Sequence, residues 1–209
     1  MFLTFEGIEG CGKSTQVHRL ADHLRTRGTA LTLTREPGGS PIGPALRSLL
    51  LSESYAVVPR TELLLYAAER AEHVARVVRP ALERSEWVLC DRYGDATRAY
   101  QCWGRGLPRE VVERAHALAS GGLEPDLTLW LNLPVEQALG RARDRNRSGG
   151  ATEGRFEAEA LAFHRRVAEG YAALAAEFPS RIAAVDGSGD PDAVFARVLA
   201  VLEARRALG

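Results

Sequence analysis

Residues 7–14 constrain the possible fold and function of this chain more than any other segment. Their sequence, GIEGCGKS, has the pattern G-x-x-x-x-G-K-S, in which the backbone N–H groups of a glycine-rich loop surround phosphate oxygens. The apolar residues 1–5 before the loop predict a buried strand, and residues 15–27 after it predict a helix whose N-terminus favours anions. Strand, loop and helix in this order predict a site for the phosphates of a nucleoside triphosphate.

The loop also contains Lys13, which is the only lysine among the 27 lysine and arginine residues of the chain. Its flexible ammonium suits the β- and γ-phosphates, where a planar guanidinium would not. The hydroxyl of Ser14 is the expected ligand of a Mg²⁺ ion that accompanies the nucleotide. The residues expected to bind this nucleotide are Gly7, Ile8, Glu9, Gly10, Cys11, Gly12, Lys13, Ser14 and Thr15.

The composition excludes several other classes of function. A formal net charge of zero and a pI near 7.0 argue against binding to nucleic acid or to an anionic membrane. No apolar run approaches the roughly 20 residues of a membrane span, and the N-terminus is strand-like rather than a signal peptide. The three cysteines form no spaced framework, so we expect a reducing, cytoplasmic environment.

Short apolar runs alternate with helical stretches along the chain. Such alternation predicts a single α/β domain, 1–209, with a three-layer, doubly wound sheet of five parallel strands. The glycine- and serine-bearing stretch 146–154 predicts a small mobile lid at about 141–155. Strands are predicted at 1–5, 30–34, 87–90, 127–131 and 182–185, and helices at 13–27, 60–84, 94–103, 108–119, 134–146, 155–177 and 190–206.

A second polar motif follows the third predicted strand. Asp91 and Arg92 would emerge at the carboxyl edge of the sheet, where open α/β sheets bind ligands. Asp91 could organise Mg²⁺, and Arg92 could neutralise phosphate charge. Asp91 with Gly94 also fits the D-x-x-G of GTPases, but those proteins read guanine with N-K-x-D, and this chain has no second lysine. The GTPase interpretation therefore fails.

Taken together, the motifs resemble those of bacterial thymidylate kinases, from the N-terminus through at least Glu157. The resemblance implies the fold of P-loop nucleoside-monophosphate kinases, a homodimer, and transfer of the γ-phosphoryl group of ATP, with Mg²⁺, to dTMP. The matching segments are FEGIEGCGKST at 5–15, TREPGGS at 34–40, LRSLL at 46–50, LLYAAER at 64–70, DRY at 91–93 and AYQ at 99–101.

The resemblance also implies a site for the thymine base and its sugar. Tyr66, where the family usually has Phe, would stack on the base, and Arg70 would point at a base carbonyl. Thr97 would lie near the base edge, and Tyr100 would lie under C2′, where a ribose hydroxyl would clash. Without the resemblance, Tyr66 and Arg70 would be interpreted as a core tyrosine beside a solvated arginine.

The phosphate and sugar of the acceptor have their own implied residues. Glu9 would bind the 3′-OH, because a carboxylate in a phosphate loop cannot hold phosphate. Arg35 and Arg92 would hold the monophosphate. Pro37 and Gln101 belong to matching motifs and are expected in the same site. The bond before Pro37 is often cis in the family, whereas X-Pro bonds in general favour trans, so the sequence leaves its state open.

The lid indicates which subclass of thymidylate kinase the chain resembles, one with an arginine in the phosphate loop or one with an arginine in the lid. The variable positions of the phosphate loop carry no basic residue, as the resemblance to the bacterial enzymes implies. A lid arginine would then supply charge in the transition state, and Arg145 is the expected residue, with Arg143 on ATP. The predicted catalytic set is thus Lys13, Asp91, Arg92 and Arg145; the remaining lid arginines are Arg141, Arg147 and Arg155, some of which would simply be solvated.

Two alternatives remain at this point. The first keeps the reaction and changes the acceptor to another pyrimidine monophosphate. The second is a P-loop regulatory ATPase, which would need no monophosphate site. Tight binding of dTMP in the absence of ATP would distinguish a kinase from such an ATPase.

Overall fold

The computed structural model describes residues 1–52, 54–149, 155–156 and 159–205, and only the backbone of residues 145–149. Five parallel strands form one sheet in the order β2-β3-β1-β4-β5, which confirms the predicted α/β class and strand number. The strands are β1 (Phe2–Glu6), β2 (Leu31–Arg35), β3 (Trp87–Asp91), β4 (Leu127–Asn132) and β5 (Ile182–Asp186).

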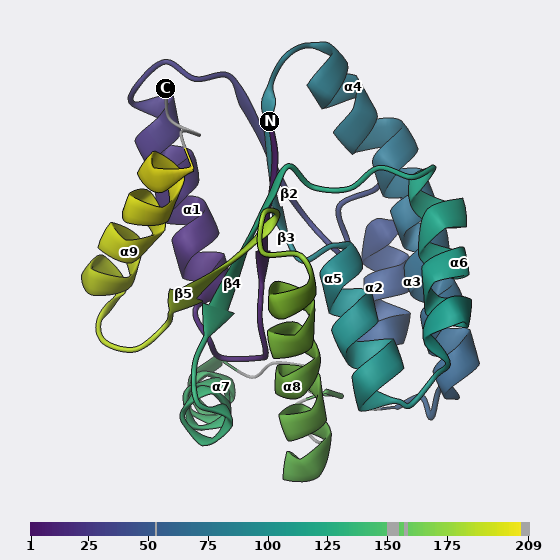
Figure 1. Cartoon of the computed structure of the whole chain (residues 1–209). Helices are drawn as coiled ribbons and strands as arrows, with labels where there is room; N and C mark the ends of the chain where they lie inside the picture. Colours follow the sequence, from purple (N-terminus) through teal and green to yellow (C-terminus); the bar gives the residue numbers. More distant parts are fainter. Residues whose placement is uncertain (53, 150–154, 157–158, 206–209) are drawn as a thin grey trace.

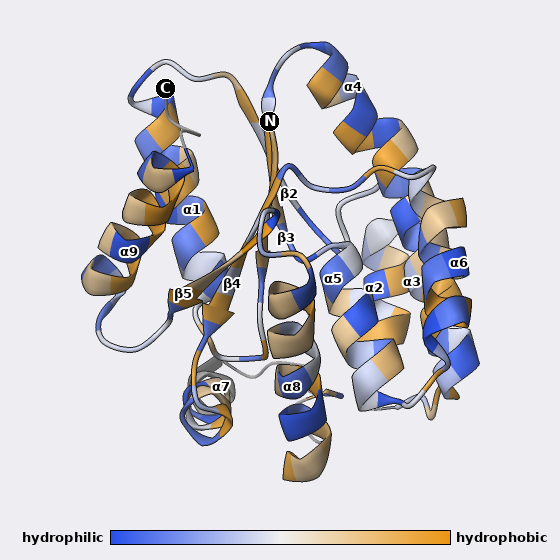
Figure 2. Cartoon of the chain, viewed as in Figure 1, coloured by the Kyte–Doolittle hydropathy of each residue, from blue (hydrophilic) through white to orange (hydrophobic). Residues whose placement is uncertain are grey.

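Strand β1 lies at the centre of the sheet. Leu3 pairs with Leu89 of β3 on one side and with Leu127 of β4 on the other. Every residue of β1 is buried, and the strands are coloured mostly as hydrophobic in Figure 2. Helices cover both faces of the sheet, which explains why the strands are continuous apolar runs rather than alternating ones.

Helices form the outer layers (Figure 1). On one face α1 (Lys13–Arg25) packs beside α9 (Pro191–Ala204). The helices of the other face include α3 (Pro59–His73), the π-helix η1 (Val74–Val78), α4 (Arg79–Glu83), α5 (Gly94–Thr97), the π-helix η2 (Arg98–Gly104), α6 (Arg109–Ser120) and α8 (Leu161–Glu177).

Two predicted helices contain a wider π-helical section. The helix predicted at 60–84 consists of α3, η1 and α4 in succession, and the helix predicted at 94–103 consists of α5 and η2. Pro80 lies at the start of α4 and has no N–H to donate to the preceding turn, which accounts for the irregularity at η1.

One helix was not predicted, and the boundaries of two others are wrong. Helix α2 (Gly43–Leu51) was not predicted; Pro44 occupies its first turn, where proline is tolerated. Helix α7 (Val135–Gly149) continues past the predicted end at 146, into the stretch assigned to the lid, whose remainder at 150–154 lies outside the described residues. Helix α8 begins at Leu161 rather than at 155, since Ala160 is extended.

The described part of the chain has no helix that combines the length and the apolar character needed to cross a bilayer.

Candidate active site

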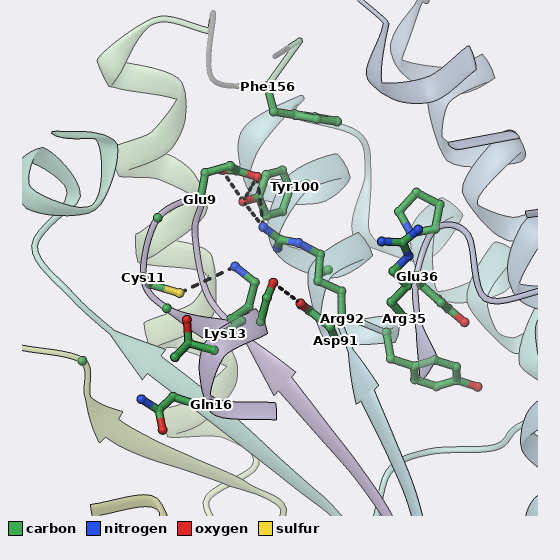
Figure 3. A pocket seen from close by; sticks show the side chains of 18 of the residues that line it. Glu9, Cys11, Lys13, Gln16, Arg35, Glu36, Asp91, Arg92, Tyr100 and Phe156 are labelled. Atoms are coloured by element: carbon green, nitrogen blue, oxygen red, sulfur yellow. Dashed lines mark hydrogen bonds and ion pairs between the residues drawn. The ribbon is translucent and has the colours of Figure 1, made fainter. Parts of the chain in front are cut away.

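A cavity of about 740 Å³ opens at the carboxyl edge of the central strands (Figure 3). The segments that follow β1, β2 and β3 meet there, together with α3 and η2. Of the predicted site residues, the cavity is lined by Glu9, Gly10, Cys11, Gly12, Lys13, Ser14, Thr15, Arg35, Pro37, Tyr66, Arg70, Asp91, Arg92, Thr97, Tyr100 and Gln101. Gly7, Ile8 and Arg143 do not line it, and the side chain of Arg145 lies outside the described residues.

Glycines allow the loop after β1 to take its shape. Gly10 has a φ of 76°, and a Cβ there would lie 1.9 Å from the carbonyl oxygen of Ala138 in α7. Gly12 has a φ of 98° and caps the N-terminus of α1. Any other residue at these positions would be strained. The loop thus leads directly into a helix N-terminus, the arrangement that binds phosphate.

Lys13 is held beneath this loop. Its Nζ donates to the carbonyl oxygen of Ile8 at 2.8 Å and contacts Sγ of Cys11 at 3.6 Å. The side chain is 7% exposed, so its charge faces the cavity with little water around it. An ammonium in such a position interacts strongly with an anion.

Ser14 and Asp91 meet across the cavity floor. The hydroxyl of Ser14 donates to Oδ2 of Asp91 at 2.7 Å, although the two residues are 77 positions apart in sequence. Both offer hard oxygen atoms, which Mg²⁺ prefers. This donor set fits the predicted metal site.

Glu9 of the phosphate loop forms a compact cluster with Arg92 and Tyr100 (Figure 3). Arg92 Nη2 donates to Oε1 of Glu9 at 3.0 Å and to the hydroxyl of Tyr100 at 3.2 Å. That hydroxyl in turn donates to the Glu9 carboxylate, 2.7 Å from Oε2. Burial alone would raise the pKa of Glu9, but the charges of Arg92 and Lys13 and the Tyr100 hydroxyl outweigh it and hold this pKa below its ordinary value.

The backbone fixes where Arg92 points. Its φ is 72°, in the left-handed region that a non-glycine residue seldom adopts. Nη1 donates to the carbonyl oxygen of Gly7 at 2.9 Å and to the hydroxyl of Tyr171 at 3.2 Å. Arg92 is therefore bound to the phosphate loop and to α8, which places a cation between them in the cavity wall.

Arg70 is buried in the wall of the cavity at 1% exposure, which excludes a solvated arginine. Its Nε donates to Oε2 of Glu36 at 2.8 Å, and Nη2 donates to the carbonyl oxygen of Tyr93 at 3.0 Å and to Oγ1 of Thr97 at 2.8 Å. Nη1 contacts Nδ1 of His116 at 3.2 Å. Of the five N–H donors of a guanidinium, these contacts engage four.

The segment after β2 carries Arg35 and Pro37. The Glu36–Pro37 peptide bond is cis, which answers the question that the sequence left open. One carboxylate oxygen of Glu69 accepts from the N–H groups of Gly38 at 3.1 Å and Ser40 at 3.2 Å, and so holds this segment. Arg35 itself is exposed, and its guanidinium has no ion pair or hydrogen bond with the described residues.

Tyr66 and Gln101 occupy the remaining wall. Tyr66 lies one turn of α3 before Arg70 and is partly buried against the core. Gln101 Nε2 donates to Oε1 of Glu62 at 2.8 Å, so its amide nitrogen is already engaged.

The described lid arginines take different partners. Arg141 donates to the carbonyl oxygens of Gly187 and Gly189, both at 3.3 Å, and lines the cavity. Arg155 forms an ion pair of 2.7 Å with the buried Glu62. Arg143 is exposed, and the side chains of Arg145 and Arg147 lie outside the described residues.

Some lining residues were not predicted. Gln16 and Phe156 line the cavity, and Glu36 connects the β2 segment to Arg70. Glu36 follows Arg35 in a matching motif and could have been proposed on that ground. Phe156 had no local signal, because its place in the wall depends on the path of the chain between α7 and α8.

The central strand of the parallel sheet leads into a P-loop, and a second group of arginines lines the same cavity. This combination defines a nucleoside-monophosphate kinase fold. The thymidylate kinase family model matches residues 5–198. A thymidylate kinase of Trichlorobacter lovleyi is 56% identical over 193 residues, 91% of each chain. One of Desulfovibrio desulfuricans is 53% identical over 207 residues, 98% of this chain and 95% of the other.

A solved structure agrees with these relatives. The crystal structure of thymidylate kinase from Ehrlichia chaffeensis superposes with a TM-score of 0.78 at 30% identity, over 97% of this chain and 98% of that one. The chain belongs to the thymidylate kinase family, whose members are ATP-dependent phosphotransferases.

Proposed function

We propose that the protein transfers the γ-phosphoryl group of ATP to dTMP, giving ADP and dTDP. One observation carries this proposal: a single cavity has a P-loop on one side and a separate set of cationic and polar side chains on the other. A regulatory ATPase would need only the first. A kinase needs both, because donor and acceptor must lie in line with little water between them.

On the donor side, the P-loop amides and Lys13 would bind the β- and γ-phosphates. Ser14 and Asp91 are the residues that would hold Mg²⁺, which when bound neutralises phosphate charge. Their hydrogen bond of 2.7 Å keeps the two oxygen atoms together before nucleotide arrives. Such preorganised charge is the main contribution a protein makes to phosphoryl transfer.

On the acceptor side, Arg35 and Arg92 would bind the monophosphate. The Glu9–Arg92 ion pair of 3.0 Å implies competition, since a phosphate dianion would displace the carboxylate from the guanidinium. Glu9 would then accept from the 3′-OH, with Tyr100 beneath the sugar. Tyr66, Arg70 and Thr97 would contact the base, and Pro37 and Gln101 would complete the wall.

We propose a single domain, 1–209, in which a lid at about 141–155 closes over the phosphates. Arg145 would then meet the transferring group, and Arg143 would contact ATP. The cysteines Cys11, Cys90 and Cys102 are all free thiols, which is consistent with the cytoplasm. No nucleic acid or membrane enters the proposal.

We further propose that the protein is a homodimer that pairs through α3 and α6. Large apolar side chains are exposed on these neighbouring helices, with Leu64 at 64% and Leu118 at 88%. Self-complementary apolar faces of this kind commonly form twofold dimers. Light scattering should give twice the mass of the chain, and Leu118→Glu should shift it toward monomer. A monomeric wild type would contradict this assembly.

Arg35 gives the cleanest test of the acceptor site, because its guanidinium binds none of the described residues. Calorimetry without ATP should show that dTMP binds the wild type and binds Arg35→Ala at least about tenfold more weakly, the loss of a charge-assisted hydrogen bond. ATP binding should be the same in both proteins. If dTMP does not bind without ATP, the regulatory ATPase becomes the better interpretation.

A further inference from the structure

A connected set of side chains lies behind the wall of the cavity that Arg70 lines. Arg70 of α3 contacts His116 of α6, and His116 contacts Glu124, which also accepts from Arg98 of η2. Arg98 is joined to Thr97 by a peptide bond, and the hydroxyl of Thr97 accepts from Arg70. The set of contacts therefore begins and ends at Arg70. His116 does not line the cavity, yet it touches the arginine that does.

The chemistry of Arg70 determines the state of His116. A guanidinium can only donate, so Nδ1 of His116, 3.2 Å from Nη1, must accept. Nε2 lies 2.9 Å from Oε1 of Glu124 and must therefore carry the hydrogen. The imidazole is thus neutral and in one tautomer, with a lone pair toward the cavity wall and an N–H toward Glu124.

The surroundings hold the ring of His116 in this orientation. It is 3% exposed, and the ring of Tyr93 meets it edge to face at 5.7 Å. Gly94 leaves the space that the ring fills, because a Cβ there would lie 2.5 Å from Cε1. The contacts with Arg70 and Glu124 favour this one orientation, because a flip about Cβ–Cγ would put carbon atoms in the places of Nδ1 and Nε2.

Glu124, which His116 contacts through Nε2, is a fixed anion. Burial alone would raise the pKa of Glu124, but hydrogen bonds from His116 and Arg98 outweigh it and hold this pKa below its ordinary value. Arg98 Nη2 donates to Glu124 at 2.6 Å, which places the carboxylate for the N–H of His116. Arg70, Glu124 and Tyr93 are the titratable groups in direct contact with the imidazole.

We propose that His116 is a positioning residue for the acceptor base. By accepting one N–H of Arg70, it fixes the guanidinium so that the N–H with no partner among the described residues is presented to the cavity. The proposal rests on the proposed function, in which the base lies against Arg70. It assigns base recognition in part to a residue of α6 that the ligand does not touch.

Two substitutions separate this role from simple packing. In His116→Asn the amide oxygen can replace Nδ1 and accept from Arg70, whereas in His116→Gln the amide nitrogen can replace Nε2 and donate to Glu124. We expect His116→Gln to raise the KM for dTMP about tenfold, the cost of a lost hydrogen bond to a charged group. We expect His116→Asn to stay within about threefold of wild type. For both variants, kcat and the KM for ATP should change little.

A packing role predicts the opposite order, because glutamine is closer in size to histidine. His23→Asn, on the opposite face of the sheet in α1, is the matched control and should leave all constants unchanged. If the KM for dTMP follows size, or if kcat and the KM for ATP move with it, His116 does not position the base.

Nitrogen-15 spectra test the tautomer without turnover. Long-range correlations should show, for the signal missing in His116→Asn, a hydrogen on Nε2 and none on Nδ1. A hydrogen on Nδ1 at neutral pH would overturn the proposal. If the wild type does not phosphorylate dTMP at all, the proposed function is wrong; if it does and the variants rank by size, only the role of His116 is wrong.

Discussion

Glu6 should make the protein less stable as the pH rises through neutrality. It is fully buried at the end of β1, where Oε1 accepts from the N–H groups of Tyr93 at 2.8 Å and Ala96 at 3.1 Å. Burial, with the nearby charge of Asp95, raises its pKa from 4.5 to about 7, against the opposing effects of Arg92 and of hydrogen bonds from Tyr171 and Tyr93. The folded protein therefore retains a proton that the unfolded chain loses.

The sign and the size of this change in stability follow from the difference in pKa between the folded and the unfolded protein. A carboxyl with a raised folded pKa contributes its full stability below the unfolded value of 4.5 and loses it as the pH rises through about 7. At about 1.4 kcal/mol per pKa unit, the loss over this window is about 3 kcal/mol. Groups with lowered pKa values, such as Glu36 and Asp95, change their contribution mainly at more acidic pH.

Glu6→Gln isolates the pH-dependent contribution of Glu6 to stability, because glutamine resembles the protonated acid and does not titrate. Urea unfolding from about pH 5 to pH 8 should show the variant gaining about 3 kcal/mol over wild type across the range. Glu203→Gln, an exposed change in α9, is the control and should show no such trend. A free-energy difference between Glu6→Gln and wild type that is the same at both ends of the range would refute the argument.

Three further predictions concern turnover. Lys13→Arg should lose at least about a hundredfold in kcat with an unchanged circular dichroism spectrum; near-normal turnover would remove Lys13 from the phosphate site. Tyr100→Ala should reduce the preference for dTMP over its ribose counterpart, worth about 1–3 kcal/mol, and an unchanged kcat/KM ratio would make Tyr100 a packing residue. Arg145→Ala should lower kcat with little change in either KM. Its comparison variant Arg155→Ala, which breaks the ion pair with Glu62, should instead lower the melting temperature. Equal kcat in both variants would place the transition-state charge on another residue.

The sheet could be predicted from the sequence because its strands are buried on both faces. Continuous apolar runs marked all five strands, and the loop pattern fixed the first crossover. Helix α2 could not be predicted, since its N-terminal prolines favour a loop until packing against α3 is known. The end of α7 was missed because glycine and serine indicated a loop where the helix continues.

The candidate site was predicted where spacing alone defines it. Residues 7–12 form the predicted phosphate loop and Lys13 begins the helix after it, while Asp91 ends β3 and Arg92 follows it. Partners across long separations could not be predicted: Arg70 meets His116 across 46 positions and Thr97 across 27. These contacts depend on how α3, α6 and η2 pack, and no local pattern encodes that.

The most direct test of the central claim is an assay of ADP release, coupled to a spectroscopic readout, across a panel of nucleoside monophosphates with ATP and Mg²⁺. We predict rapid turnover with dTMP, clearly slower turnover with its ribose counterpart and with cytidine and purine monophosphates, and none without an acceptor. Faster turnover with another monophosphate, or ADP release that is independent of any acceptor, would contradict it.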